Sequence, residues 1–457
     1  MRGLLQRGVA GRVILCCLFV VLGQFAGAES EPGLRAVYDK VRTETNAATE
    51  AERGSSVEEG TLTIRLTPSY LAVRENDSES VFNFNAGRVV ILDHTERSAI
   101  EYSLYVQPAF REREFVNRAF MSGALAKVFG QKYHLVEAES QLGMLASPPA
   151  KLKMSERQRD AERVFVLNKR EAVSFTPAAL QVPEALRKAL DRLYLFEAQM
   201  HPSVRHALTA GGQLPARLKY GYKLFDSETT VVWELRDAVL EELDLATAAA
   251  AYPVGPLDDT PIMLAAFRVR SGQAGPTPTL EDYRARAARL LEEGRAFESF
   301  LVCMEAAFAT GEFPEKVVQR ARDAGAQDPG LKAYVRAMDL ETRGGDPNEA
   351  LRLLEALDAE QLQGGAAIHV QRANQYLRLR QRGQAIEEFG RALSINPFMM
   401  GPWHDAGLAF ANDAGGYAAA KAWTCWDAAR AAVADAPEMS DVREMEEALR
   451  RKHPEFF

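Results

Sequence analysis

The sequence has little cysteine and no long run of basic residues. Only 4 of its 457 residues are cysteine, and two of them, Cys16 and Cys17, lie in an apolar stretch near the N-terminus. The remaining pair, Cys303 and Cys425, is far apart in helical patterns, too few for a disulfide framework. We expect both to be buried free thiols, because cysteine is among the most buried residue types. The net charge of −8 and the missing basic run argue against nucleic acid as a partner.

The sequence also lacks the motifs of common enzyme classes. It contains no G-x-S-x-G, no H-E-x-x-H, no Walker loop and no C-x-x-C. Its 7 histidines are scattered, and His201 and His206 do not have the three-or-four spacing that aligns metal ligands on a helix. We therefore predict a protein that is not an enzyme and has no catalytic residues, no metal site and no cofactor.

The first 28 residues form the three-part pattern of a secretory signal peptide. Arg2, Arg7 and Arg12 give a basic start, residues 13–25 are apolar, and Ala-Gly-Ala follows at 26–28. The apolar run is shorter than the roughly 20 residues that a membrane span needs, and no later segment is apolar enough to span. The sequence thus predicts cleavage after residue 28 and a soluble protein in the periplasm, or an equivalent exported compartment. An uncleaved N-terminal anchor is the alternative.

Period-two patterns dominate the first half of the chain after a polar start. Residues 29–59 are polar and helix-tolerant, whereas from Gly60 to Tyr105 apolar residues alternate with polar ones between turn signals, which predicts an antiparallel meander. Asp93-His94 falls at a junction of strand and turn. A turn is favoured there over a catalytic pair, because aspartate bonds nearby backbone N–H groups and no nucleophile or ligand motif points at the histidine.

The later part of this half alternates between helical and strand patterns. We expect helices over residues 111–129 and from Pro183 to about Gly211, short strands at 164–167 and 173–175, and longer strands after Pro215 and around Trp233. Residues 147–161 are rich in proline and charge, which predicts a loop. Residues 268–280 contain two glycines and two prolines, which predicts a linker.

Beyond Thr279 the pattern is helical and repeats. Trp403-x2-Ala406-Gly407-x2-Phe410, followed by Ala419-x3-Trp423, fits the pattern W-x2-L-G-x2-Y and A-x3-F, and Ala385-x3-Phe389 lies 34 residues earlier. Ala350 and Leu354 continue the series after an interval of 35 residues. Over residues 283–435 the chain resembles tetratricopeptide-repeat proteins. An unrelated helical bundle is the alternative.

This resemblance implies stacked helical hairpins with aromatic wedges and a groove lined by the first helix of each repeat. Trp403 and Phe389 match the wedge positions. The residues that match groove positions are Asn374, Arg378, His404 and Asn412. The implied partner is another protein or peptide, although plain structural stacking remains open for each of these residues. Capture of a peptide carboxylate needs several aligned cations, and only Arg378 is there.

The order of strands and helices over residues 33–265 is similar to the periplasmic lipoprotein-carrier superfamily, a half-open barrel with helices plugging its mouth. The stretches LAVRENDSESVFNFNAGRVVILDHTERSAIEY and GQLPARLKYGYKL carry this resemblance. It implies an apolar cavity for a lipid or acyl ligand. The candidate lining residues are aromatic: Phe82, Phe84, Tyr102, Tyr220 and Tyr222. Plain core packing is the alternative, because aromatic residues at period two usually belong to a core.

Together these patterns predict a multidomain protein. An α+β antiparallel half-open barrel is expected over residues 33–267 and an all-α tetratricopeptide-like solenoid over 281–457, joined by the 268–280 linker. The predicted function is that of an exported, non-enzymatic envelope scaffold that binds proteins through its repeats. The alternative is a carrier or binding protein for a lipid, lipoprotein or other hydrophobic ligand in the half-barrel.

Overall fold

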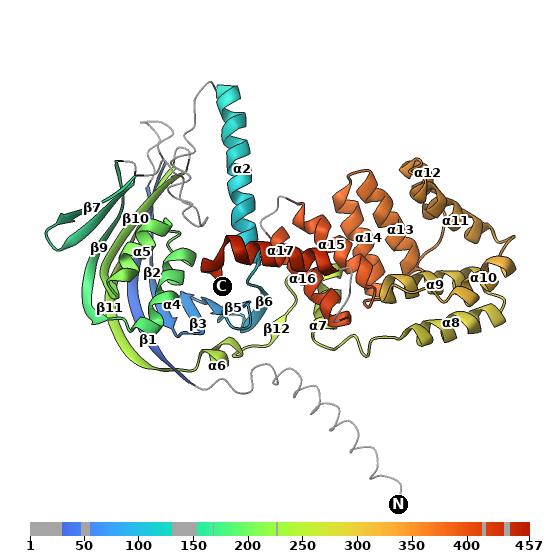
Figure 1. Cartoon of the computed structure of the whole chain (residues 1–457), viewed down its shortest axis with the longest axis horizontal. Coiled ribbons are helices and arrows are strands. Elements are labelled where there is room, and N and C mark those ends of the chain that lie inside the picture. The colour runs from blue at the N-terminus through green and yellow to red at the C-terminus, as the bar shows by residue number, and fades with distance from the viewer. Residues whose placement is uncertain are drawn as a thin grey trace, which may run out of the picture. The chain divides into compact units, whose positions relative to one another are not determined.

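The computed structural model describes residues 30–46, 55–129, 153–167, 169–224, 227–413, 417–433 and 439–457 (Figure 1). The predicted signal peptide lies outside these residues. The described chain divides into two compact units. The sheet unit contains the residues up to Val254 and also Glu446–Phe457, and the helical unit contains Gly255–Met445.

The sheet unit is built on a 12-stranded sheet that does not close on itself. Its strand order is β12-β6-β5-β4-β3-β2-β1-β11-β10-β9-β8-β7. The strands are β1 (Glu31–Asn46), β2 (Ser55–Leu66), β3 (Tyr70–Glu75), β4 (Ser78–Asn83), β5 (Arg88–Asp93), β6 (Ser98–Ser103), β7 (Met154–Arg159), β8 (Glu162–Leu167), β9 (Arg170–Gln181), β10 (Gln213–Leu224), β11 (Ser227–Leu243) and β12 (Val254–Gly255). The predicted meander from Gly60 to Tyr105 is therefore present as β2 to β6.

The pairing of β1 with β11 joins two meanders that are far apart in the sequence. The two strands run antiparallel from Glu31↔Leu243 to Asn46↔Ser227, with an irregularity between Val37 and Tyr38. The polar, helix-tolerant interpretation of residues 29–59 was wrong, because this segment supplies β1 and the start of β2. In β1, Leu34, Ala36 and Tyr38 are buried while the residues between them are only half-buried. The alternation is that of a strand with one covered face.

One face of the sheet packs against helices α4 (Arg187–Phe196) and α5 (Pro202–Ala210), and we call it the covered face. Figure 1 shows the sheet curving around them. The sequence predicted one helix from Pro183, but the chain forms a short 3-10 turn (Glu184–Leu186), then α4 and α5. The break is at Gln199, whose positive φ of 48° cannot continue a helix. His201 then caps α5 by accepting a hydrogen bond from Ser203 N.

Two further segments of the sheet unit bear on the prediction. Helix α2 (Val106–Phe129) contains the expected helix at 111–129. The expected loop at 147–161 is wrong in its described part, because β7 pairs there with β8 from Met154↔Leu167 to Arg159↔Glu162. All residues of β7 are exposed, so the strand has no buried side to produce an alternating pattern.

The helical unit consists of helices in the part of the chain that is described. They are α7 (Pro261–Arg270), α8 (Leu280–Glu292), α9 (Ala296–Thr310), α10 (Glu315–Ala324), α11 (Pro329–Thr342), α12 (Pro347–Glu355), α13 (Ala366–Arg378), α14 (Arg382–Ile395), α15 (Met400–Ala411), α16 (Ala418–Ala432) and the start of α17 (Ser440–Lys452). Helices α8 and α9, α11 and α12, α13 and α14, and α15 and α16 pack as sequential pairs. Gly294, with φ of 79°, makes the turn of the first pair.

Helices α7 and α9 pack across several of these pairs. Helix α9 contacts α11, α13 and α15, the first helices of three pairs, whereas α7 contacts α14 and α16. The predicted linker therefore begins inside α7 and lies within the helical unit, where Thr277 Oγ1 donates to Ala432 O at 3.3 Å. The structure divides the chain at Val254/Gly255 and at Met445/Glu446, which differs from the predicted division at 267 and 281.

The two residues matched to wedge positions are in the core of the helical unit. Trp403 and Phe389 are fully buried, and Trp403 Nε1 donates to Pro397 O at 2.8 Å. A Cβ at Gly407 would collide with the indole of Trp426, so α15 and α16 approach closely only because residue 407 is glycine. None of the described helices is both long and apolar enough to cross a membrane.

We expect Phe389→Ala to lower the free energy of unfolding of the helical unit by about 3–5 kcal/mol, through lost transfer free energy and the cavity left behind. Ile395 lies on the same helix but is 46% exposed. Ile395→Ala is therefore the matched control and should change stability by less than about 0.5 kcal/mol. Urea unfolding followed by circular dichroism measures both. Equal losses in the two variants would contradict the burial of Phe389.

Candidate functional site

Asp93 and His94 do not act on each other. Asp93 ends β5, and its Oδ1 accepts hydrogen bonds from the backbone N–H groups of Thr95 and Glu96 at 2.9 and 2.8 Å. The carboxylate is thus used by the turn, which agrees with the turn interpretation.

His94 instead connects two other residues. Its Nδ1 lies 2.9 Å from Tyr252 Oη, and its Nε2 lies 2.9 Å from an oxygen of Glu79, which is 3% exposed and also pairs with Arg65. Both ring nitrogens are therefore engaged. The arrangement fastens the turn after β5 to the segment that precedes β12, and we assign it a structural role.

Three of the predicted cavity residues gather at one end of the covered face. Phe82 on β4 and Tyr102 on β6 both lie opposite Val89 on β5, which places the three side chains in one row. The ring of Phe82 stacks on Phe196 of α4 with centroids 4.4 Å apart, and Phe84 lies 6.4 Å from the same ring. The rings of Phe82 and Phe84 thus pack against Phe196 of α4, and we call these three residues the aromatic cluster.

The other two predicted cavity residues lie elsewhere. Tyr220 on β10 is buried edge-on against Trp233 of β11, with centroids 5.8 Å apart. Tyr222 belongs to β10, but its side chain is outside what the structure describes. The predicted set is therefore split between two regions of the same face.

Arg192 of α4 lies at the aromatic cluster, and the sequence analysis did not find it. Its side chain is 3% exposed, and its guanidinium carbon is 3.7 Å from the centroid of the Phe84 ring. Within the described residues, its Nε has no hydrogen-bond partner. The neighbouring carboxylate of Asp191 pairs with Arg205 at 2.7 Å. Burial lowers the pKa of Arg192 to about 10.

The end of the sequence completes this cluster. Residues His453–Phe457, which we call the HPEFF segment, pack on the covered face, with Phe456 fully buried and its ring 5.6 Å from that of Phe196. Phe457 O accepts a hydrogen bond from Lys188 Nζ at 2.9 Å. His453 Nε2 lies 2.7 Å from Glu112 of α2, a contact that lowers the pKa of Glu112 to about 2.

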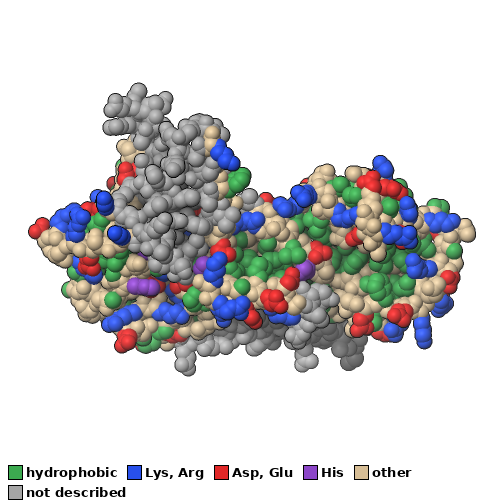
Figure 2. All heavy atoms as spheres, turned by 45° about the horizontal axis from the view of Figure 1, so that its top comes forward, with side chains coloured by type: hydrophobic (Ala, Val, Ile, Leu, Met, Phe, Trp, Pro, Cys, Tyr) green, Lys and Arg blue, Asp and Glu red, His purple; other side chains and the backbone are tan. Residues whose placement is uncertain are grey.

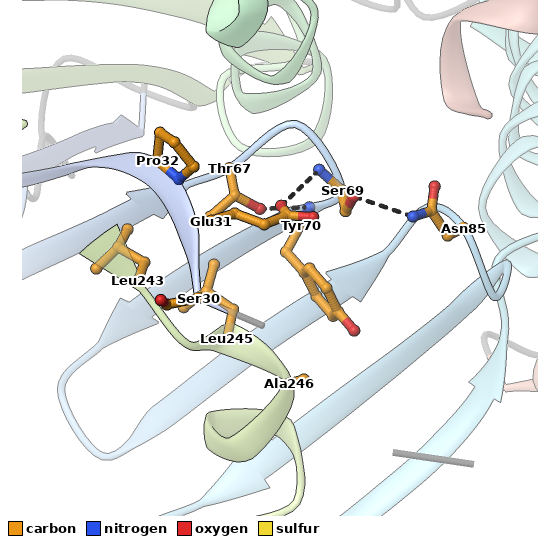
Figure 3. Close-up of a pocket in the computed structure, with 10 residues that line it drawn as sticks. All are labelled: Ser30, Glu31, Pro32, Thr67, Ser69, Tyr70, Asn85, Leu243, Leu245 and Ala246. Atoms are coloured by element: carbon orange, nitrogen blue, oxygen red, sulfur yellow. Dashed lines mark hydrogen bonds between the residues drawn. The ribbon is translucent and has the colours of Figure 1, made fainter. Parts of the chain in front are cut away.

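A separate pocket of about 380 Å³ opens where β1 begins and β11 ends (Figure 3). Its lining is half polar: Ser30, Glu31, Pro32, Thr67, Ser69, Tyr70, Asn85, Leu243, Leu245 and Ala246. Several of its polar groups already bond one another, since Glu31 accepts from Ser69 N at 3.3 Å and Asn85 Nδ2 donates to Ser69 Oγ at 2.9 Å. We assign no ligand to this pocket.

Two of the predicted groove residues belong to one hydrogen-bonded group on α11 and α13. Glu341 accepts from Asn374 Nδ2 at 3.4 Å and from Gln375 Nε2 at 2.9 Å, and Arg378 donates to Gln375 Oε1 at 2.7 Å. We call these four residues the 341–378 network. Burial raises the pKa of Glu341, and the nearby charge of Asp405 on α15 adds to the effect. Arg378 is exposed, so the network reaches the surface.

His404 and Asn412 have local partners instead. His404 lies 3.0 Å from Asp405 and 3.1 Å from Asp441 of α17, and these two carboxylates raise its pKa to about 8. Asn412 ends α15, where its Nδ2 donates to Leu408 O at 2.9 Å. His404 thus ties α15 to α17, and Asn412 terminates a helix.

The surface charges are mixed. On the face that Figure 2 presents, lysine and arginine side chains are interspersed with aspartate and glutamate. Recognition on that face would depend on short-range contacts more than on a long-range electrostatic field.

No group of three or more His, Cys, Asp or Glu side chains in the described part of the chain is placed to hold a metal ion. Cys303 and Cys425 are buried free thiols, as predicted, and burial raises the pKa of Cys303 to about 12.

A buried acid in the helical unit was also missed by sequence reasoning. Glu305 of α9 is 1% exposed, and burial raises its pKa to about 7. Arg286 of α8 lies 3.5 Å away and Asn396 Nδ2 lies 3.4 Å away, while Asn396 also bonds the hydroxyl of Tyr283. Glutamate is usually exposed, so only its position in the strongly apolar sequence of α9 signalled burial.

Comparison of the sequence with protein-family models and with curated proteins gives no match.

The raised pKa of Glu305 makes the stability of the helical unit depend on pH. The folded state keeps a proton that the unfolded chain loses above its ordinary value of 4.5, so stability should fall as pH rises from there through about 7. Glu305→Gln should remove this component and, at alkaline pH, gain on the order of 3 kcal/mol relative to wild type. Urea unfolding over this pH range measures it.

The exposed Glu292 of α8 provides the control. Glu292→Gln should leave the pH dependence of unfolding unchanged. If Glu305→Gln retained the slope of the wild type, the buried acid would not be its source.

Proposed function

We propose that this chain is an exported, non-enzymatic envelope protein that acts as a protein-interaction scaffold through its helical repeats. The observation that carries the proposal is the 341–378 network. It connects α11 and α13, the first helices of two successive pairs, and ends at the exposed Arg378. Arginine is over-represented among the residues that contribute most to protein interfaces. Export is supported by the three-part pattern of residues 1–28.

The position of α9 limits where a partner would bind. Tyr334 of α11 and Ala367 and Ile368 of α13 share a buried cluster with α9, so α9 covers part of both helices. The 341–378 network lies at the C-terminal ends of the same helices. The exposed Arg378 therefore marks the surface that we propose for a partner.

The chemistry of this surface favours an extended peptide segment with both a donor and an acidic group. Arg378 also donates to Gly345 O at 2.6 Å, which fixes its guanidinium next to the α11–α12 turn. Because a held guanidinium loses little rotamer freedom on binding, it can pair with a carboxylate at low entropic cost. Glu341 lies close enough to Arg378 and Asp405 for both charges to act on it.

Site-specific photo-crosslinking tests the scaffold function. A photoreactive amino acid in place of Arg378 should capture a discrete partner protein in the cells that produce this chain. Glu387 is an exposed charged residue on α14, a second helix, and is the matched control position. It should capture none. Identical patterns at both positions, or no product at 378, would contradict the proposal.

A second candidate function is a carrier or binding protein for a lipid, lipoprotein or other hydrophobic ligand, held on the covered face of the sheet unit. The observation that favours it is the aromatic cluster of Phe82, Phe84 and Phe196, which holds a buried arginine. A core built only for stability would gain from an apolar side chain in place of Arg192, because burying a charge is costly.

Native mass spectrometry of the purified full chain tests this second function. We expect a fraction of the protein to carry a bound molecule that organic extraction removes and that contains an acyl chain. Protein that is free of such adducts when isolated without detergent would argue against a carrier.

A further inference from the structure

Arg192 is a buried cation that forms no ion pair among the residues that the structure describes. Its side chain is 3% exposed, and the described residues provide no partner for its Nε. Asp191 is adjacent in sequence and its charge acts on Arg192, but its carboxylate pairs with Arg205. Stacking on Phe84 at 3.7 Å offsets part of the cost of burying the guanidinium, yet a ring face cannot accept its in-plane hydrogen bonds. A buried donor of this kind is expected to be matched by an acceptor from elsewhere.

The side chains around Arg192 combine apolar rings with a second cation. Phe196 lies one turn after Arg192 on α4, and Lys188 lies one turn before it, so the three share a face of the helix. Burial lowers the pKa of Lys188, and the charge of Arg192 lowers it further, which shows that the two cations are close. Lys188 is exposed, and its ammonium group therefore marks the rim of the cluster.

The HPEFF segment contacts the aromatic cluster with an apolar side chain and Lys188 with a polar atom, as an amphiphile would. Phe456 buries its ring against Phe196, while Phe457 O accepts the hydrogen bond of Lys188 at 2.9 Å. An apolar group lies among the aromatic rings, and an oxygen lies at the cationic rim. The segment does not satisfy Arg192. Phe457 O is bonded to Lys188, and the charge of Glu455 acts on Asp191 and Arg205.

The contacts that hold the segment are few and mostly at its edges. His453 pairs with Glu112 at 2.7 Å, and Lys452, which precedes the segment, pairs with the same carboxylate. Phe457 is half-buried and lies against Tyr105, with centroids 4.9 Å apart. Phe456 and His453 are both buried, so displacing the segment uncovers one large apolar side chain and one imidazole.

We propose that the aromatic cluster on the covered face is a binding site for a single acyl chain that ends in an anionic group, that Arg192 and Lys188 receive this head group, and that the HPEFF segment occupies the site until such a ligand displaces it. The proposal rests on the second proposed function and names its ligand class. A carboxylate or phosphate supplies the acceptors that the guanidinium lacks, and charge-assisted bonds of this kind are about twice as strong as neutral ones.

Binding of dansyl-labelled undecanoic acid and of its methyl ester to the full chain tests the proposal. Phe456→Ala/Phe457→Ala weakens the internal competitor, so this double variant should bind the acid at least about tenfold more tightly than wild type. In the wild-type background, Arg192→Gln should weaken binding of the acid by about tenfold and leave the methyl ester unchanged. Arg192→Lys, which keeps the charge, should restore part of the preference for the acid.

Arg187 is the matched control, because it is an exposed arginine on the same helix. Arg187→Gln should not alter either affinity. Displacement of the probe by dodecanoate or by dodecyl phosphate identifies which anionic group the site prefers, and either result supports the proposal. Dodecanol displacing the probe as well as these anions would overturn it.

The outcomes separate this inference from the carrier function. If the acid and the ester bind equally and Arg192→Gln changes neither, the hydrophobic site stands and the role of Arg192 is overturned. If neither probe binds the double variant, with its circular dichroism unchanged from wild type, the site itself is overturned. The Arg192→Gln measurement requires no change to the HPEFF segment, so it decides the head-group role even if the double variant fails to fold.

Discussion

The antiparallel pairing of β1 with β11 is the contact on which the sheet unit depends. It joins the meander β1–β6 to the strands β7–β11, which are separated from it by α2. Without this ladder, the strands that face α4 and α5 would belong to two smaller sheets, each with an exposed apolar face and an unpaired edge. Tyr38 of β1 and Trp233 of β11 meet across it with ring centroids 5.7 Å apart, so the core of the covered face is assembled there.

Both units place a segment of their own chain on the surface that the resemblances single out for a ligand. In the helical unit, α9 packs against the first helices of three pairs, and in the sheet unit, the HPEFF segment packs on the aromatic cluster. Each of these segments buries apolar side chains, such as Phe456, that would otherwise face water. The remaining polar groups, Arg378 in one unit and Arg192 in the other, are what give the two proposed functions their chemistry.

Much of the fold was readable from local patterns. The alternation from Gly60 to Tyr105 predicted β2 to β6, and the spacing of Phe389, Trp403 and Gly407 predicted two helical pairs with buried aromatic residues. The candidate sites were less readable. Period two predicted that Phe82, Phe84 and Tyr102 share a face, and the structure places Phe82 and Tyr102 in one row; their role as cavity residues stays a prediction. Arg192 and Glu305 were missed, because charged residues are expected at the surface unless their neighbours in space are known.

The sequence by itself determined the elements whose period is local and the turn at Asp93, since each depends on residues close along the chain. Only the tertiary structure decided that residues 31–46 are a strand, that α7 belongs to the helical unit, and that Glu446–Phe457 joins the sheet unit. These three outcomes depend on partners more than a hundred residues away, such as Leu243 for Glu31 and Phe196 for Phe456. Burial against distant residues is a property of the folded chain, and no local pattern records it.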